Sequence, residues 1–210
     1  MKYELQLPSS ALVEKFIPKE RFYERSVVNT KIRDEFQNKV KRITWKYKLS
    51  EETIGVDKTE EVEEIQIFEI ELKEKVIPTK VLNLINKLIP YPILYIFLFD
   101  DNFAYGVSLI DDKQTYYFSE WDKEFDFRFD GLDLKKVYEN IVSEFITKVE
   151  KKDQEFDKLI EIDKNIKSVE HEIEVLKSKI KNENQFNRKV ELNRLLHNKE
   201  DEYRELQEKS

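Results

Sequence analysis

The chain contains no cysteine, and glycine, methionine and histidine are almost as scarce. Its 210 residues include three glycines, one methionine and two histidines. Without cysteine there are no disulfides, no thiolate metal ligands and no cysteine nucleophile. Three scattered glycines cannot build a glycine-rich phosphate loop or a dinucleotide-binding fingerprint. The missing residues therefore exclude several common classes of enzyme.

Long apolar runs are also absent. The most apolar stretch, Ile93–Phe99, is far too short to span a bilayer. The first residues, Met1-Lys2-Tyr3-Glu4, do not lead into the apolar core of a secretory signal peptide. From these two observations we expect a cytoplasmic protein without a membrane partner. The formal net charge of -7 argues against a protein whose main role is to coat nucleic acid.

What the chain does contain is regular apolar patterning, which predicts an α+β domain over residues 1–150. Ile65 and Ile67 alternate with glutamate and glutamine, as in a strand with one solvent-exposed face. The unbroken apolar run Ile93–Phe99 is typical of a buried central strand. An antiparallel meander is predicted to follow it over residues 103–118. We therefore predict a small, mostly antiparallel sheet with packed helices.

Several helices are predicted around this sheet. Pro78-Thr79 opens a helix that Pro90 stops. From Asp133, a good N-cap, no glycine or proline interrupts a helix before Asn182. The alternating phenylalanines of residues 125–129 are expected either to add a last strand or to pack as an aromatic edge.

A further helix is predicted from Thr30, with apolar residues on one side as far as Ile43. Its other face becomes basic toward the end and carries interleaved aromatic residues. The candidate nucleic-acid contacts on it are Lys41, Arg42, Trp45, Lys46 and Lys48. Basic and aromatic side chains together can hold a single strand by charge and stacking. A charged helix face whose aromatic side chains turn inward would give the same sequence pattern. The negative net charge of the chain favours this alternative over direct nucleic-acid contact.

The C-terminal part, residues 151–210, has the strongest periodicity in the chain. Apolar residues recur at alternating steps of three and four over Leu159–Ile180, as in a coiled-coil seam. The phase breaks around Glu183, and a second apolar series covers Phe186–Leu206. We predict that the chain folds back about Glu183 into a long antiparallel coiled-coil helical hairpin.

The predicted turn sets the pairing of the two arms, with Ile162 facing Tyr203. One alternative is a single long helix that pairs between chains instead of within one. A homodimer is a further hypothesis, in which two hairpins pack as a four-helix bundle. It rests on Ile160, Val175 and Leu195, which widen the apolar seams beyond what two helices need.

Both histidines, His171 and His197, fall on this hairpin. We expect His171 beside Leu195 rather than opposite His197, so that the two do not ligate one metal. No serine or threonine has neighbours that suggest a nucleophile with its base. The sequence therefore predicts no metal site and no cofactor, and it favours a protein that is not an enzyme.

One pattern supports an enzymatic alternative. Glu69, Glu71 and Lys73 fall on one face of a predicted strand by alternation. In metal-dependent nucleases, strand carboxylates bind Mg²⁺ and a lysine stabilises charge at the attacked phosphate. A half-exposed strand in a chain this rich in glutamate and lysine produces the same pattern readily. The alternative hypothesis is a Mg²⁺-dependent nuclease-like domain whose cleavage is lost on Glu71→Ala.

A set of short sequence segments, spread over nearly the whole chain, points to a family. They are Leu7-Pro8, Ile17-Pro18-Lys19, Phe22-Tyr23, Ile43–Ser50, Glu64–Ile70, Ile89–Leu94 and Gln185–Asn193. Together and in this order they resemble an uncharacterised bacterial family, domain-of-unknown-function family four-three-nine-one. The resemblance implies a context of small genes beside helicase and DNA methyltransferase subunits of restriction-like phage-defence systems. It carries over no catalytic residues, because no activity is established for the family.

From the hairpin and the implied context we predict a non-enzymatic accessory or scaffolding subunit. Its hairpin would bind a larger protein, a helicase or DNA methyltransferase subunit of a phage-defence or restriction-modification system. The predicted partner-binding residues at the tip and on the second arm are Phe186, Arg188, Lys189 and Asn193. Exposed aromatic residues often anchor interfaces. The alternative for Phe186 is that it closes the hairpin's own core.

Overall fold

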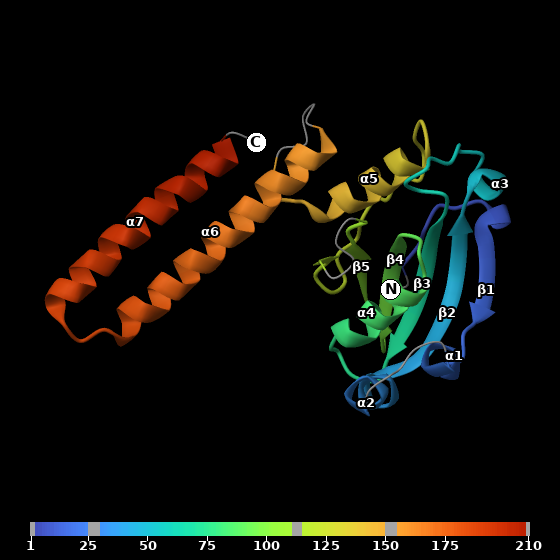
Figure 1. Ribbon diagram of the computed structural model, residues 1–210, viewed down its shortest axis with the longest axis horizontal. Helices are drawn as coiled ribbons and strands as arrows, with labels where there is room; N and C mark the ends of the chain where they lie inside the picture. The colour runs from blue at the N-terminus through green and yellow to red at the C-terminus, as the bar shows by residue number, and fades with distance from the viewer. Residues whose placement is uncertain (1–2, 25–29, 111–114, 150–154, 209–210) are drawn as a thin grey trace. The chain divides into compact units, whose positions relative to one another are not determined.

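The computed structural model describes residues 3–24, 30–110, 115–149 and 155–208 (Figure 1). The chain forms two compact units, residues 1–145 and 146–210. The first unit contains the sheet, and the second contains two long helices packed together, α6 (Phe156–Asn182) and α7 (Phe186–Glu208). The predicted α+β fold class is confirmed.

Six strands form one sheet, and each strand pairs with the next one along the chain. They are β1 (Leu12–Phe16), β2 (Val40–Leu49), β3 (Ile65–Leu72), β4 (Ile93–Phe99), β5 (Asn102–Ser108) and β6 (Tyr116–Phe118). All neighbouring strands are antiparallel except β3 and β4, which are parallel. A parallel pair needs a crossover connection. Here the crossover contains helix α4 (Thr79–Leu88).

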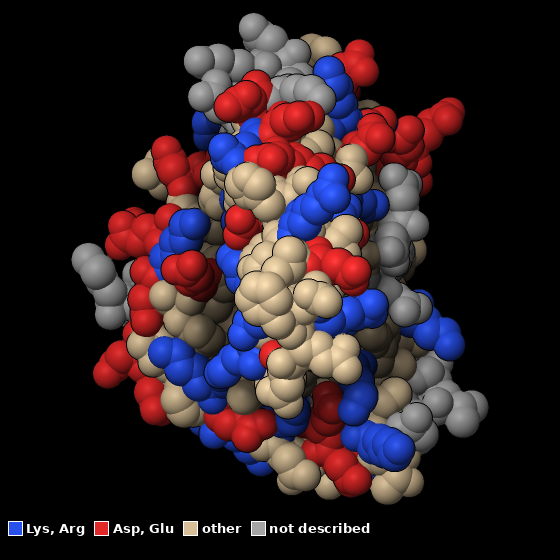
Figure 2. All heavy atoms as spheres, turned by 90° about the vertical axis from the view of Figure 1, so that its left-hand side faces the viewer, with Lys and Arg blue, Asp and Glu red and all other residues tan. Residues whose placement is uncertain are grey.

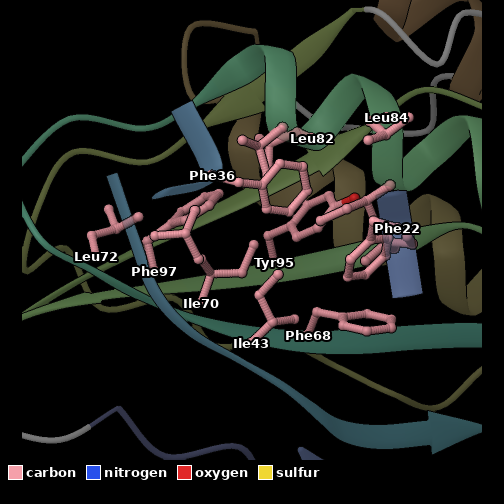
Figure 3. Close-up of a cluster of buried hydrophobic side chains, with 14 of the residues drawn as sticks. Phe22, Phe36, Ile43, Phe68, Ile70, Leu72, Leu82, Leu84, Tyr95 and Phe97 are labelled. Carbon is pink, nitrogen blue, oxygen red and sulfur yellow. The ribbon is translucent and has the colours of Figure 1, made fainter. Parts of the chain in front are cut away.

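One face of the sheet is covered by helices from the first half of the chain, α1 (Glu20–Glu24), α2 (Thr30–Lys39) and α4. Figure 3 shows how Phe22 of α1, Phe36 of α2 and Leu82 of α4 meet the side chains of β4. The rings of Phe22 and Phe36 stack with their centroids 5.7 Å apart. Helix α4 supplies apolar residues at helical spacing, which is why it can lie flat on the strands.

Aromatic rings pack on the opposite face. Ala104 of β5 belongs to the core cluster, so the side chain of the next residue, Tyr105, points to the other face, because side chains alternate along a strand. Its ring meets Phe127 edge to face at 5.0 Å, and Phe125 meets Phe145 at 4.9 Å. Phe145 is the last residue of helix α5 (Leu134–Phe145). Residues 125–129 form no strand, so the aromatic-edge alternative describes them.

Two short helices complete the first unit. They are the 3₁₀ helix η1 (Ser9–Ala11) and α3 (Glu51–Ile54). Ser50 is the N-cap of helix α3, and its backbone N–H donates to the Thr53 hydroxyl at 2.8 Å. It ends at Gly55, whose φ of 69° lies in the left-handed region that glycine tolerates.

Val40–Leu49 is a strand, so the helix predicted from Thr30 was extended too far. Helix α2 stops at Lys39 and β2 follows directly. Val40 and Ile43 continue the helical spacing of the apolar residues before them. The end of the helix could therefore not be recognised from this spacing. From Ile43 to Leu49, however, apolar and polar residues alternate strictly, and this is the period of a strand. Pairing with strands on both sides stabilises the extended form.

The uninterrupted helix predicted from Asp133 to Asn182 is also wrong. Helix α5 ends at Phe145, and α6 begins at Phe156. Between them Ile146 and Val149 are buried outside any helix. Tertiary burial here overrides a local sequence that contains no helix breaker. The remainder of this predicted stretch, residues 150–154, lies outside the described residues.

The C-terminal arms pair within one chain. Helix α6 ends at Asn182, the chain turns over residues 183–185, and α7 runs back along α6 (Figure 1). The turn falls at the predicted Glu183. The alternative of one continuous helix through this point is therefore wrong. None of the helices in the described ranges has the length and apolar content that a membrane span requires.

Candidate functional site

Polar contacts between α6 and α7 fix how the two arms are aligned. The Tyr203 hydroxyl donates to Glu170 Oε1 at 3.0 Å, and Lys199 pairs with Glu172 at 2.8 Å. Tyr203 thus lies beside Glu170 and not beside Ile162, and the predicted alignment was wrong by roughly two helical turns. Apolar spacing alone is nearly unchanged by a shift of two turns, so the charged pairs decide between the alternatives.

This alignment leaves the start of α7 uncovered. Compared with the pairing predicted from apolar spacing, α7 is shifted along α6 toward the turn. Its first residues therefore extend to the end of α6 and beyond. Phe186 is 79% exposed and Val190 is 52% exposed. The alternative in which Phe186 closes the hairpin's own core is therefore wrong. Figure 2 views the molecule from the side of the turn and shows an uncharged patch amid mixed charges.

The other predicted partner-binding residues lie on the same two turns of α7. Arg188 forms an ion pair with Glu191 at 3.6 Å. The Asn193 side-chain amide donates to the Lys189 carbonyl oxygen at 2.7 Å. Arg188, Lys189 and Asn193 are all exposed or half-exposed. We call the surface formed by Phe186, Arg188, Lys189, Val190 and Asn193 the tip surface.

One side of the hairpin carries an apolar groove between α6 and α7. Its lining includes the apolar residues Val175, Leu176 and Leu195 and the basic residues Lys179 and Lys199. Leu195 is 52% exposed. The sequence places Leu176 in the seam itself, and it assigns Val175 and Leu195 to the homodimer hypothesis because they are apolar positions outside the seam.

The other side of the hairpin is polar. Lys148 forms a salt bridge with Glu170, whose carboxylate raises the pKa of the Lys148 ammonium. Lys177 pairs with Glu200 at 3.3 Å. His197 lies on this side, whereas His171 lies in the apolar groove with Leu195. The two histidines thus line different sides of the hairpin.

The three residues of the nuclease hypothesis each have a different partner. Glu69 accepts a hydrogen bond from the Tyr3 hydroxyl. Glu71 pairs with Lys41 at 3.0 Å. The Lys73 ammonium donates to the Gln37 carbonyl oxygen at 2.7 Å.

Lys73 follows the last residue of β3, and its contact is with the end of α2. The strand alternation that was expected to align it with the two glutamates does not extend to it. In the described part of the chain, no three or more acidic or histidine side chains are grouped as a metal ion would require.

The basic residues proposed for nucleic-acid contact all lie on β2 and have intramolecular partners. Lys46 pairs with Glu14 at 2.8 Å, and Lys48 pairs with Glu64 at 2.6 Å. The Arg42 guanidinium lies over the Phe16 ring, 5.4 Å from its centroid. With Lys41 paired to Glu71, these cations are offset by neighbouring carboxylates and an aromatic ring. Trp45 is half-buried, and its indole N–H donates to the Tyr47 carbonyl oxygen at 3.1 Å.

Comparison with known proteins identifies one family. The family model described as "Domain of unknown function (DUF4391)" matches residues 5–202. No curated protein and no solved structure matches the chain significantly.

Proposed function

The chain belongs to the DUF4391 family, and we propose that it is a non-enzymatic accessory subunit that binds a larger protein through its C-terminal hairpin. The partner that we propose is a helicase or DNA methyltransferase subunit of a phage-defence or restriction-like system. The choice of partner rests on the sequence resemblance, and the binding surface rests on the hairpin.

The observation that supports this proposal most directly is the unequal burial of the two arms. Helix α7 has 23 residues, and none of those described is fully buried. Phe186, Val190 and Leu195 each expose about half of their area or more. A helix that leaves so much apolar surface in water is typical of an interaction surface. Contacts among the described residues leave those side chains open to solvent.

Phe186 is suited to act as an anchor. It projects from the first position of α7, next to the turn, where no neighbouring helix covers it. Aromatic side chains dominate interface energetics because they bury a large area at a low cost in rotamer entropy. Lys189 beside it adds positive charge, which would steer an acidic surface of the partner toward the tip, whereas Arg188 is paired with Glu191.

The test is a binding measurement with the helicase or methyltransferase subunit encoded beside this chain. Phe186→Ala should weaken the complex by about 30-fold or more, the value for an aromatic anchor worth about 2 kcal/mol or more. Leu132→Ala is the matched control, because Leu132 is 88% exposed and lies in the other unit. It should leave the affinity unchanged.

A deletion extends the test to the whole hairpin. A chain without residues 152–210 should lose partner binding, while circular dichroism still reports a folded first unit. A truncated protein that binds at full strength would end the proposal. Sedimentation of the free protein tests the homodimer hypothesis, which is compatible with the same surface.

A further inference from the structure

The first unit contains a cavity of about 310 Å³ at one end of its core. It lies between α1, the end of α4 and strands β2 and β3, so that segments far apart in the sequence form its walls. Aromatic walls come from Phe22, Trp45 and Phe68. Figure 3 shows Phe22 and Phe68 beside one another at the edge of the core cluster. The volume is at the lower end of the range for ligand pockets, about 300–1,000 Å³.

A buried amide is part of this mostly apolar lining. Gln66 is 4% exposed, and its side-chain oxygen has no hydrogen-bond partner among the described residues. A buried acceptor that is left unsatisfied is unfavourable, and native proteins rarely retain one without a reason. A ligand that donates an N–H or O–H group would satisfy it.

The neighbours of Gln66 determine which end of its amide is available. Its Nε2 donates to Glu64 Oε2 at 2.9 Å, and Glu64 Oε1 pairs with Lys48 at 2.6 Å. An ionised carboxylate only accepts hydrogen bonds, so the NH₂ group must face Glu64. The oxygen is therefore the end left for another donor. Small side-chain rotations of the kind that accompany ligand binding would bring a donor to it.

The same lining contains one basic residue, Arg21. The Arg21 side chain is exposed and forms no ion pair with any residue that the structure describes. Glu64, the acidic residue of the lining, is already neutralised by Lys48. The Arg21 guanidinium is therefore the charged group of the lining that is left for a ligand. A guanidinium in this position suits a carboxylate or phosphate group.

We propose that this cavity binds a small planar aromatic molecule that carries an N–H donor and an anionic group. The ring packs against Trp45 and Phe22, the donor reaches the Gln66 oxygen, and the anionic group pairs with Arg21. The site lies in a different unit from the hairpin and does not depend on the proposed accessory role.

The first experiment uses para-aminobenzoate and the full-length protein. Its ring has an amine at one end and a carboxylate at the other. The chain has two tryptophans, so ¹⁵N–¹H spectra contain two indole signals. Binding in the cavity should shift the signal of Trp45 and leave that of Trp121, which is not part of the lining. If no shift of the Trp45 signal occurs up to millimolar concentrations, the proposal is wrong.

Two matched ligands separate the two polar contacts. Benzoate lacks the amine, and aniline lacks the carboxylate. Each should bind about tenfold more weakly than para-aminobenzoate, as expected for loss of one hydrogen bond to a buried or charged partner. Gln66→Leu should remove the difference between para-aminobenzoate and benzoate. Arg21→Gln should remove the difference between para-aminobenzoate and aniline.

Arg128→Gln is the control variant, because Arg128 is exposed in the same unit and is not part of the lining. It should bind like the unaltered protein. Arg21 is exposed, so Arg21→Gln is expected to fold even if Gln66→Leu does not. If Arg21→Gln and Arg128→Gln bind para-aminobenzoate equally, the assigned site is wrong.

Discussion

At the scale of single residues, the core contains a polar chain that ties helix α4 to the sheet. The Tyr95 hydroxyl is fully buried and donates to Asn86 Oδ1 at 2.7 Å. Asn86 Nδ2 donates to the Tyr116 hydroxyl at 2.9 Å, and that hydroxyl donates to Asn83 Oδ1 at 2.9 Å. Burial raises the pKa of Tyr95 well above its usual value. These bonds set the position of α4 along β4, which apolar contacts alone would leave adjustable.

Removing the first donor should have a measurable effect on stability. Tyr95→Phe should lower the free energy of unfolding by about 1–3 kcal/mol, because Asn86 loses a buried donor. Tyr116→Phe should cost less, since Tyr116 is only half-buried. Urea denaturation of both variants provides the measurement. Equal unfolding midpoints for Tyr95→Phe and the unaltered protein would contradict the role of this contact.

Tyr105 predicts how stability depends on alkaline pH. Burial raises the pKa of Tyr105 from 10.0 to about 12. The folded state therefore holds this proton more tightly than the unfolded state. Its contribution is complete below about pH 10 and is lost as the pH rises toward about 12. Unfolding free energies measured across this window should fall by about 2 kcal/mol more in the unaltered protein than in Tyr105→Phe.

At the scale of elements, charged pairs decide the alignment of the hairpin. The apolar residues of α6 and α7 repeat at nearly equal spacing, so several alignments would bury similar areas. Lys199 with Glu172 and Lys177 with Glu200 are satisfied together in the observed alignment. Exposed pairs of this kind are each worth less than about 1 kcal/mol. Together they can select one alignment when the alignments that bury similar apolar areas are close in energy.

A zero-length carbodiimide cross-linker reports this alignment directly. It should join Lys177 to Glu200 and Lys199 to Glu172, because these groups lie 3.3 Å and 2.8 Å apart. Glu200→Gln should remove the first link and keep the second. Mass spectrometry of the digested protein identifies the links. Links that instead connect the neighbourhoods of Ile162 and Tyr203 would support the alignment predicted from apolar spacing.

At the scale of the whole molecule, the chain divides its tasks between two units. The first unit contains the entire core cluster shown in Figure 3 and every residue that lines the proposed ligand cavity. The second unit contains the tip surface and the apolar groove. The two proposals can therefore be tested separately.

A fragment of residues 1–145 should fold without the hairpin. Since its core cluster is complete, we expect cooperative thermal unfolding of the fragment. Both tryptophans lie in it, so their two indole signals should keep the positions seen in the full chain. A fragment that gives collapsed, unresolved spectra would show that the first unit needs the hairpin for folding.

Much of the fold could be predicted from local patterns. Strong alternation predicted β3, the unbroken apolar run predicted β4, and Pro78 with Pro90 bracketed α4. The boundary between α2 and β2 was missed because Val40 and Ile43 continue the helical spacing, while Ile43 also begins the alternation of the strand. Where two periods overlap, the partners across the sheet decide, and a single sequence does not show them.

The candidate sites were less predictable. Phe186 could be placed at the hairpin tip from the break in phase, but its exposure depends on an alignment that charged pairs set. The cavity was not predicted. Its lining includes Ile17, Trp45, Gln66 and Tyr91. Each of these residues lies in a different one of the sequence segments that resemble the family. Only the folding of α1 and the end of α4 against the sheet brings them together.

The sequence by itself determined the class of fold, the site of the hairpin turn and the absence of cysteine chemistry. These depend on composition and on short-range periodicity, which act within a few residues of each position. The tertiary structure alone decided where α2 and α5 end, how the two arms of the hairpin align, and which buried amide oxygen lacks a partner. These depend on contacts between residues distant in the chain, whose energies differ by only a few kcal/mol between alternatives.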